Sequence, residues 1–244
     1  MPPFPLHRFS EFSALTLRQR EVLASLTRSP RRYPRRTVLR QEGATASHVW
    51  LLHAGWVGSS IDLPSAKRQL VKVHLPGDVL GSTSMCLAAA GDTLAALSDV
   101  VASMVPFDTL GQLFADDPRM AASFLLSVQK ERVALMHKLA EIGRTSAYER
   151  VAGLMLDLLT RGRAAGVVDG NAIDAPLTQE QIADLLGLTN VHVNRMLRKL
   201  NDDGLVSGTH GRYVIADEAG LAASVPFHPT FAHEPAWLPE AADA

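Results

Sequence analysis

Residues 178–200 read TQEQIADLLGLTNVHVNRMLRKL, a pattern typical of two short helices joined by a tight turn. Gln179, Ala183, Gly187 and Val193 lie at the spacing of a helix-turn-helix. A small residue at Ala183 allows the two helices to approach, and Gly187 allows the backbone to turn between them. This stretch therefore predicts a helix-turn-helix in the C-terminal part of the chain.

The second helix of this motif separates an apolar face from a polar one. Val193, Met196, Leu197 and Leu200 follow the i, i+3, i+4, i+7 rule and are expected to face the core. The opposite face carries side chains able to contact base edges and phosphates, namely Asn190, Val191, Asn194, Arg195 and Arg198. The alternative is an ordinary helical hairpin with a solvated outer face. The pattern favours a helix that reads DNA.

The sequence on either side supports this interpretation. Thr178 opens a capping box at the first helix, and Thr189 can cap the second, which leaves N–H groups there to meet a phosphate. Residues 201–215 (NDDGLVSGTHGRYVI) then contain two short apolar runs punctuated by glycine. They predict a β-hairpin wing with His210 and Arg212 near its tip.

Composition excludes several classes of protein. The chain has 244 residues, a formal net charge of −1 and one cysteine, so it forms no internal disulfide. Neither a signal-peptide layout nor a run of about 18 apolar residues is present, so we expect a cytoplasmic protein without a membrane segment. One cysteine cannot ligate an iron–sulfur cluster, and no histidine lies in a pattern that singles it out for haem. We expect no cofactor, no metal and no catalytic site, and a buried, inert thiol at Cys86.

The N-terminal half changes character along its length. Residues 16–27 open with a capping box and predict a short amphipathic helix. An arginine cluster follows, interpreted as a solvated, proline-stiffened connection rather than a nucleic-acid patch. Its members are Arg28, Arg31, Arg32, Arg35, Arg36 and Arg40. Residues 37–107 contain short β-rich runs separated by Gly and Pro, which predict an antiparallel barrel or sandwich.

A long helix is predicted at residues 118–142. Apolar positions recur in steps of four and three along it, which is the geometry of helices packed along their length. The predicted dimer-interface positions are Leu125, Val128, Arg132, Leu135, Leu139 and Ile142. A core-facing helix could show the same stripe, but helix-turn-helix proteins commonly pair to read two half-sites, which favours a dimer. Arg132 departs from the apolar seam, and either pairs across the interface with a residue such as Glu131 or extends to solvent.

The order of these elements predicts that the chain divides into four segments. They are an effector domain at 1–117, the dimerisation helix at 118–142, a winged helix-turn-helix domain at 143–220 and a Pro/Ala-rich tail at 221–244. Gly143 is expected to end the long helix. The tail is either disordered or docked through its aromatic residues Phe227, Phe231 and Trp237.

In this order of elements the chain resembles the Crp/Fnr family of bacterial transcription regulators. The marks of the resemblance are Gly43, Gly55, the Pro76–Asp78 turn (PGD), Gly81 and the helix-turn-helix. The resemblance implies an α+β protein with an N-terminal antiparallel, jelly-roll-like β-roll, a dimerisation helix and a C-terminal winged helix-turn-helix. It also implies a homodimer that binds a palindromic promoter site and contacts RNA polymerase.

Departures from the family pattern concern the effector. Members that bind cyclic nucleotides carry a glutamate just after the Gly81 position and an arginine shortly beyond, whereas this chain has Ser82 and then Gly91–Ala95 (GDTLA). Neither arginine nor lysine occurs in residues 73–118, so a buried phosphate would find no cation there and Asp92 would repel it. Cyclic AMP is therefore not expected to bind. The predicted degenerate effector pocket comprises Gly81, Ser82, Thr93 and Leu94.

The resemblance also assigns roles on the recognition helix. Arg195 matches the arginine that reaches a guanine or a phosphate. Val191 replaces a glutamate, so a thymine methyl becomes the suitable contact, while Asn190 and Asn194 suit adenine. His192 is expected to point towards the DNA backbone. The remaining predicted DNA contacts are Thr189, Arg198, Lys199 and Arg212.

The sequence thus predicts a dimeric, sequence-specific DNA-binding regulator and not an enzyme. The alternative is a small-molecule-sensing β-roll protein whose helix-turn-helix no longer binds DNA specifically. Within the favoured interpretation, the β-roll either senses an unidentified effector or serves as a ligand-independent scaffold.

Overall fold

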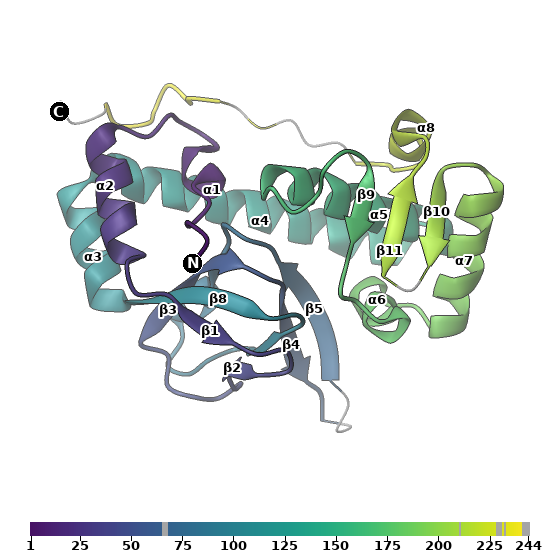
Figure 1. Ribbon diagram of the computed structural model, residues 1–244, viewed down its shortest axis with the longest axis horizontal. Helices are drawn as coiled ribbons and strands as arrows, with labels where there is room; N and C mark the ends of the chain where they lie inside the picture. The colour runs from purple at the N-terminus through teal and green to yellow at the C-terminus, as the bar shows by residue number, and fades with distance from the viewer. Residues whose placement is uncertain (65–67, 210, 228–230, 232, 241–244) are drawn as a thin grey trace. The chain divides into compact units, whose positions relative to one another are not determined.

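The computed structural model describes residues 1–64, 68–209, 211–227, 231 and 233–240. It is an α+β protein, as predicted, and Figure 1 labels most of its elements. The chain divides into two compact units. The first comprises residues 1–62, 73–133 and the described part of 230–244, and the second comprises the described part of 63–72 and 134–229. Among the described residues, no helix has the length and apolar character needed to cross a membrane.

The predicted antiparallel β-roll is present as two four-stranded sheets. Strands pair antiparallel within both of them. The first sheet has the order β1 (Arg31–Tyr33), β8 (Val100–Pro106), β3 (His48–Ala54) and β6 (Val79–Leu80). The second has the order β2 (Val38–Arg40), β7 (Thr93–Ala96), β4 (Val57–Asp62) and β5 (Arg68–His74).

Strand β3 is buried on both faces, which explains why HVWLLHA is apolar almost throughout. Successive side chains of a strand point to opposite faces of its sheet. Trp50 and Leu52 therefore pack with Val57 and Leu94 of the second sheet, in the core of the roll. The intervening Val49 and Leu51 belong to another apolar cluster, formed with residues of the helices, including Phe9, Leu23, Leu110, Leu113 and Met120.

The helices of the first unit begin at caps that the sequence provides. They are α1 (His7–Ser10), α2 (Leu17–Leu26), α3 (Phe107–Asp116) and the first part of α4 (Pro118–Arg144). At α2, the N–H of Gln19 donates to Thr16 Oγ1 at 3.2 Å, and the N–H of Thr16 donates to Gln19 Oε1 at 3.0 Å. This confirms the capping box predicted at residue 16. At α4, the Asp117 carboxylate accepts the N–H of Met120 at 2.9 Å.

Gly143 does not end the long helix, contrary to the sequence-based expectation. Helix α4 continues to Arg144, with Gly143 inside it. A glycine costs a helix only about 1 kcal/mol relative to alanine, so it can be carried within a long one. The break comes from Ser146, which forms a capping box with Glu149 and starts helix α5 (Ala147–Ala164).

The arginine cluster divides between surface and core. Arg28, Arg31, Arg32, Arg35 and Arg36 are exposed, as expected for a solvated segment. The first strand, β1, begins within this segment at an edge of its sheet. Arg40 is different, because it ends β2 and is buried inside the roll. The expectation of a solvated side chain is therefore wrong for Arg40.

Cys86 also departs from expectation, because its side chain is exposed. The segment STSMC forms the short 3-10 helix η1 (Ser82–Cys86). Ser84 is the member of this turn whose side chain is fully buried, while Cys86 lies at its end. The backbone geometry of the tight turn thus decides which side chain faces inward. The apolar composition of the segment does not decide it.

The second unit contains the predicted helix-turn-helix and wing. Its helices after α4 are α5, α6 (Gln179–Leu186), α7 (Asn190–Asp202) and α8 (Glu218–Ala223). Its strands are β9 (Ala172–Asp174), β10 (Val206–Thr209) and β11 (Arg212–Ile215). The β10–β11 pair is the predicted hairpin, with Val206 opposite Ile215. Helix α5 and strand β9 were not predicted from the sequence, and His210, predicted near the tip of the wing, lies outside the described residues.

The described part of the C-terminal tail contacts the protein surface. Within the second unit, the Phe227 ring stacks on His137 with their centroids 4.7 Å apart. Within the first unit, Phe231 packs edge-to-face on Phe12 at 6.5 Å, and the N–H of Glu234 donates to the Phe12 carbonyl at 2.7 Å. Trp237 remains 57 % exposed. Of the two alternatives for the tail, these contacts favour docking.

We predict that Leu52→Ala lowers the free energy of unfolding by about 2–5 kcal/mol, because it leaves a cavity between the two sheets. Leu52 is 0 % exposed, whereas Leu17 is 77 % exposed. The matched control Leu17→Ala should therefore change stability by no more than about 0.5 kcal/mol. Urea denaturation followed by circular dichroism measures both. Equal effects of the two variants would contradict the assignment of the roll core.

Candidate nucleic-acid interface and effector pocket

The turn between α6 and α7 has the geometry that its sequence predicts. Gly187 ends α6 in the left-handed region, with φ of 61°, where a residue without Cβ is favoured. The N–H of Leu188 donates to the Ala183 carbonyl at 2.9 Å, which closes the turn. Ala183 is itself buried at 4 % exposure. The two positions that identified the motif therefore serve the packing roles expected of them.

Both helices of the motif are capped by threonine, as predicted. The N–H of Gln181 donates to Thr178 Oγ1 at 3.1 Å, and the Thr178 N–H donates back to Gln181 Oε1 at 2.9 Å. At α7, Thr189 Oγ1 accepts the N–H of His192 at 3.3 Å. A capped N-terminus with further N–H groups and positive dipole charge is suited to bind an anion such as a phosphate.

Helix α7 has one buried face and one exposed face. Val193 and Leu200 are 0 % exposed and Met196 is 9 % exposed, so the i, i+3, i+7 stripe faces the core. Val191 by contrast is 76 % exposed. The other exposed candidates for DNA contact on this segment are Thr189, Asn190, His192, Arg195, Arg198 and Lys199. Because the buried stripe faces the core, the side chains of this outer face stay accessible to a ligand.

Two contacts order polar side chains on or beside this face. Asn194 Nδ2 donates to both the carbonyl and the Oδ1 of Asn190, each at 3.1 Å. The Lys199 ammonium lies 4.9 Å from the centre of the Tyr148 ring, and the Tyr148 hydroxyl donates to Asp203 Oδ2 at 2.6 Å. Burial and this hydrogen bond raise the pKa of Tyr148 to about 12. Sequence reasoning missed Tyr148, because it lies on α5, far from the motif in the chain.

The wing contributes one candidate. Arg212 begins β11, and its Nε lies 3.8 Å from Asp174 Oδ1 on β9. Both side chains are about 70 % exposed, at 71 % and 70 %. An exposed pair of this kind contributes little stability, so Arg212 can exchange its partner for a phosphate at small cost.

The predicted seam of α4 is exposed along its length. The exposed fractions are 49 % for Leu125, 38 % for Val128, 59 % for Leu135, 73 % for Leu139 and 49 % for Ile142. A core-facing stripe would be buried, so that alternative is wrong for these positions. The α4 residues that face the core are Met120 and Ser123 instead. Arg132 is exposed as well, whereas its suggested partner Glu131 pairs with Arg8 of the same chain.

The predicted effector-pocket residues lie in two different settings. Gly81 caps η1 with φ of 80°, and Ser82 begins that turn. Thr93 and Leu94 are fully buried in β7. Thr93 Oγ1 accepts the N–H of Glu42 at 3.0 Å, and the Leu94 side chain belongs to the core between the sheets. Thr93 and Leu94 are thus committed to the packing of the roll itself.

A cation does lie beside this pocket, which corrects the sequence argument. Arg40 comes from β2, outside the 73–118 stretch, and its guanidinium lies next to Gly81, where a Cβ would collide with it. Arg40 Nη2 donates to Asp92 Oδ1 at 2.6 Å, and both residues are buried. Asp92 was expected to repel a phosphate with no cation nearby. Instead, the Asp92 carboxylate neutralises a cation that the tertiary structure supplies.

Comparisons with protein families agree with this arrangement. Residues 30–117 match the model of the cyclic nucleotide-binding domain, and residues 149–224 match that of the Crp-like helix-turn-helix domain. The first match covers the β-roll and the second covers the winged unit. Both functional regions therefore lie within domains of known type.

Individual relatives span most of the chain. It is 22 % identical over 210 residues to the transcriptional activator protein FnrA of Stutzerimonas stutzeri, covering 86 % of each chain. It is 30 % identical over 163 residues to the nitrogen fixation regulation protein FixK of Bradyrhizobium diazoefficiens, covering 66 % of this chain and 67 % of the relative. The structure of FixK2 from Bradyrhizobium japonicum has the same fold, with a TM-score of 0.73 at 23 % identity, over 82 % of this chain and 98 % of that one.

We predict that Arg40→Met lowers the free energy of unfolding by about 3–5 kcal/mol, because the Asp92 carboxylate then stays buried without its cation. The double variant Arg40→Met/Asp92→Asn should recover part of that loss, since no charge is stranded. Arg163→Met is the matched control, because Arg163 forms an exposed pair with Glu218, and it should cost no more than about 1 kcal/mol. Equal losses for the single and double variants would contradict the charge pairing.

Proposed function

Since the chain belongs to the Crp/Fnr family of transcription regulators, we propose that it binds a palindromic promoter site as a homodimer. The observation that carries the proposal is the exposed outer face of α7, above a stripe that is buried at Val193, Met196 and Leu200. A helix that packs on the core with one face can enter the major groove with the other. The relatives named above are a transcriptional activator and a nitrogen fixation regulation protein, which agrees with a role other than catalysis.

The proposed reading of bases follows from the chemistry of that face. Arg195 reaches a guanine or a phosphate, and the exposed Val191 methyl groups meet a thymine methyl. Asn190 and Asn194 read adenine; the two hydrogen bonds between them are both donated by Asn194, so they use none of the side-chain N–H groups of Asn190. The proposed backbone contacts are Thr189, His192, Arg198, Lys199 and Arg212.

The exposed apolar stripe of α4 supports the homodimer. Leu125, Val128, Leu135, Leu139 and Ile142 recur on one face of a 27-residue helix and are all exposed in the single chain. A contiguous apolar stripe of this length is unfavourable in water, and a second copy of the same helix covers it. Symmetric pairing then places two recognition helices to read two half-sites.

We propose the domain roles that the sequence predicts. Residues 1–117 form the effector domain, residues 118–142 form the dimerisation helix, and residues 143–220 form the DNA-binding domain. RNA polymerase is proposed as a partner on the family resemblance. Cyclic AMP is proposed not to bind, because the nearby cation, Arg40, is already held by Asp92. The competing function, a sensing β-roll with a helix-turn-helix that no longer binds DNA, receives no support from the exposed set on α7.

We predict that Arg195→Ala weakens binding to the specific site by roughly 10- to 100-fold at moderate salt, because the arginine contact to a base edge is lost. Lys199→Ala should weaken binding to specific and random duplexes alike. Fluorescence anisotropy on a site selected from a random DNA pool measures both, with Arg163→Ala on α5 as the control. Unchanged specific binding by Arg195→Ala would mean that the proposed docking is wrong.

We predict that Leu139→Asp raises the dimer dissociation constant by about 100-fold or more, because two carboxylates would be buried in an apolar interface. Leu139 is 73 % exposed in the single chain, so the folded monomer should remain as stable as the wild type. Sedimentation equilibrium gives the dissociation constant. Leu17→Asp is the matched control, because Leu17 is 77 % exposed and lies outside the stripe. An equal rise of the dissociation constant in Leu17→Asp would mean that the α4 stripe is not the dimer interface.

A further inference from the structure

A series of polar side chains runs through the interior of the roll, starting at the Arg40–Asp92 ion pair. Ser59 Oγ donates to Asp92 Oδ2 at 2.7 Å and also lies 2.9 Å from His74 Nε2. Arg40, Ser59, His74 and Asp92 are all buried, at 4–8 % exposure. Because the single hydroxyl proton of Ser59 is used by Asp92, His74 Nε2 must be protonated and donate to Ser59. The direction of each hydrogen bond in this half of the series is therefore fixed.

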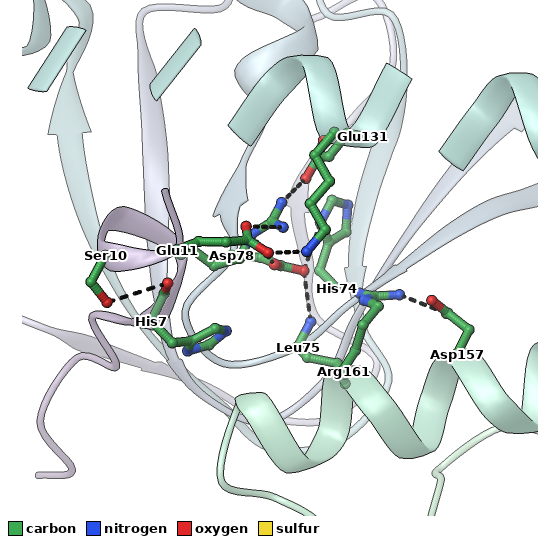
Figure 2. Close-up of polar contacts among 11 residues, drawn as sticks. His7, Ser10, Glu11, His74, Leu75, Asp78, Glu131, Asp157 and Arg161 are labelled. Carbon is green, nitrogen blue, oxygen red and sulfur yellow. Dashed lines mark hydrogen bonds and ion pairs between the residues drawn. The ribbon is translucent and has the colours of Figure 1, made fainter. Parts of the chain in front are cut away.

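The series continues from His74 to the long helix. His74 Nδ1 lies 3.8 Å from Asp78 Oδ2, an ion pair when the imidazole carries a proton on Nδ1 as well as on Nε2, and Arg8 Nε lies 3.2 Å from Asp78 Oδ1. Arg8 Nη2 in turn donates to Glu131 of α4 at 2.5 Å. Figure 2 shows Asp78 among His74 of β5, Glu11 just after α1, and Glu131 of α4.

Asp78 is the member of the series whose carboxylate accepts a hydrogen bond from a backbone N–H group. Its Oδ2 accepts the N–H of Leu75 at 3.0 Å, so the PGD turn is closed around the carboxylate (Figure 2). The N–H of Gly77 donates to the Leu52 carbonyl at 2.7 Å, which ties the turn to strand β3. A Cβ at Gly77 would collide with the His7 ring, so α1 packs directly on this turn. The turn thus connects the roll to Arg8 and to its neighbour His7.

Arg8 has the geometry of a clamp. Its planar guanidinium meets Asp78 through Nε, Glu131 through Nη2 and Glu11 through Nη1, the last at 3.6 Å. Lys130 of α4 also pairs with Glu11. A lysine could not contact three carboxylates in these fixed directions, because it carries one compact ammonium. The side chains of Arg8, Glu11 and Glu131 are only 15–24 % exposed, so these contacts are weakly screened.

We propose that Arg8 is the positioning residue that holds α4 on the roll, and that the buried relay Arg40–Asp92–Ser59–His74–Asp78 couples this clamp to the roll interior. The relay contains charges that are stable only when each partner is present, so a change at one end alters the other. A change of packing beside Gly81 then alters how α4, the proposed dimerisation helix, is held on the roll, and no bound effector is needed for this. The consequence for dimerisation rests on the proposed function, whereas the coupling to α4 does not.

Hydrogen exchange in α4, followed by mass spectrometry on the full chain without DNA, tests the relay. Arg8→Lys keeps the charge but loses the fork, and Asp92→Asn acts at the far end of the relay. Each variant is expected to raise exchange in residues 120–133 by about tenfold or more, because local opening becomes easier. Arg163→Lys, which alters an exposed ion pair outside the relay, should leave exchange there unchanged.

Two results would overturn the proposal. If Arg8→Lys raises exchange in residues 120–133 and Asp92→Asn does not, Arg8 is a local contact and no relay exists. If neither variant raises it, Arg8 does not position the helix. Unfolding of the whole first unit is recognised separately, since exchange would then rise equally in β3 and β8 of the roll. In that event Ser59→Ala replaces Asp92→Asn, because it removes the middle link and no charge, and an unchanged α4 would again overturn the relay.

The same variants separate this proposal from the proposed function. Their dimer dissociation constants, measured by sedimentation, are expected to rise together with α4 exchange. Failure of the wild-type chain to bind DNA would refute the proposed function while the exchange result still decides the relay. If exchange in α4 rises while the dimer dissociation constant is unchanged, the dimer interface does not lie on α4, and the proposed role of Arg8 still holds.

Discussion

Burial of strand β3 on both faces is the constraint on which the first unit depends. One face must be covered by the second sheet and the other by helices, so the roll cannot be completed without α1–α4. The first part of α4 is thereby joined to the roll by apolar packing at Met120 and Phe124. The same helix leaves its other face, from Leu125 to Ile142, exposed. A helix fixed on one side and apolar on the other is suited to join two copies of the chain.

The roll interior shows how buried charge is accommodated. Isolated ions are too costly to bury, so Arg40 and Asp92 occur together and are supplemented by Ser59. In the family pattern, this region receives the charge of a ligand, whereas here both charges belong to the protein. The Arg40 guanidinium is thus already paired within the protein, which agrees with the proposal that cyclic AMP does not bind.

Local signals in the sequence were reliable where a short-range rule applies. The capping boxes at Thr16 and Thr178, the left-handed turn at Gly187 and the buried stripe of α7 involve residues within one or two helical turns of each other. Spacing alone is enough to predict such features. The same kind of reasoning failed at Gly143, because the capping box at which α5 starts lies beyond it, and at Cys86, because composition does not say which residue of a turn faces inward.

The sequence by itself determined the α+β class, the order of roll, long helix and winged helix-turn-helix, and the face of α7 proposed to meet DNA. It did so because periodicity and capping are properties of neighbouring residues. Only the tertiary structure decided that Arg40 is buried against Asp92, that Arg8 joins Asp78 to Glu131, and that Tyr148 lies beside Lys199. Each of these pairs joins segments far apart in the chain, and no local pattern specifies which distant charges must neutralise one another once water is excluded.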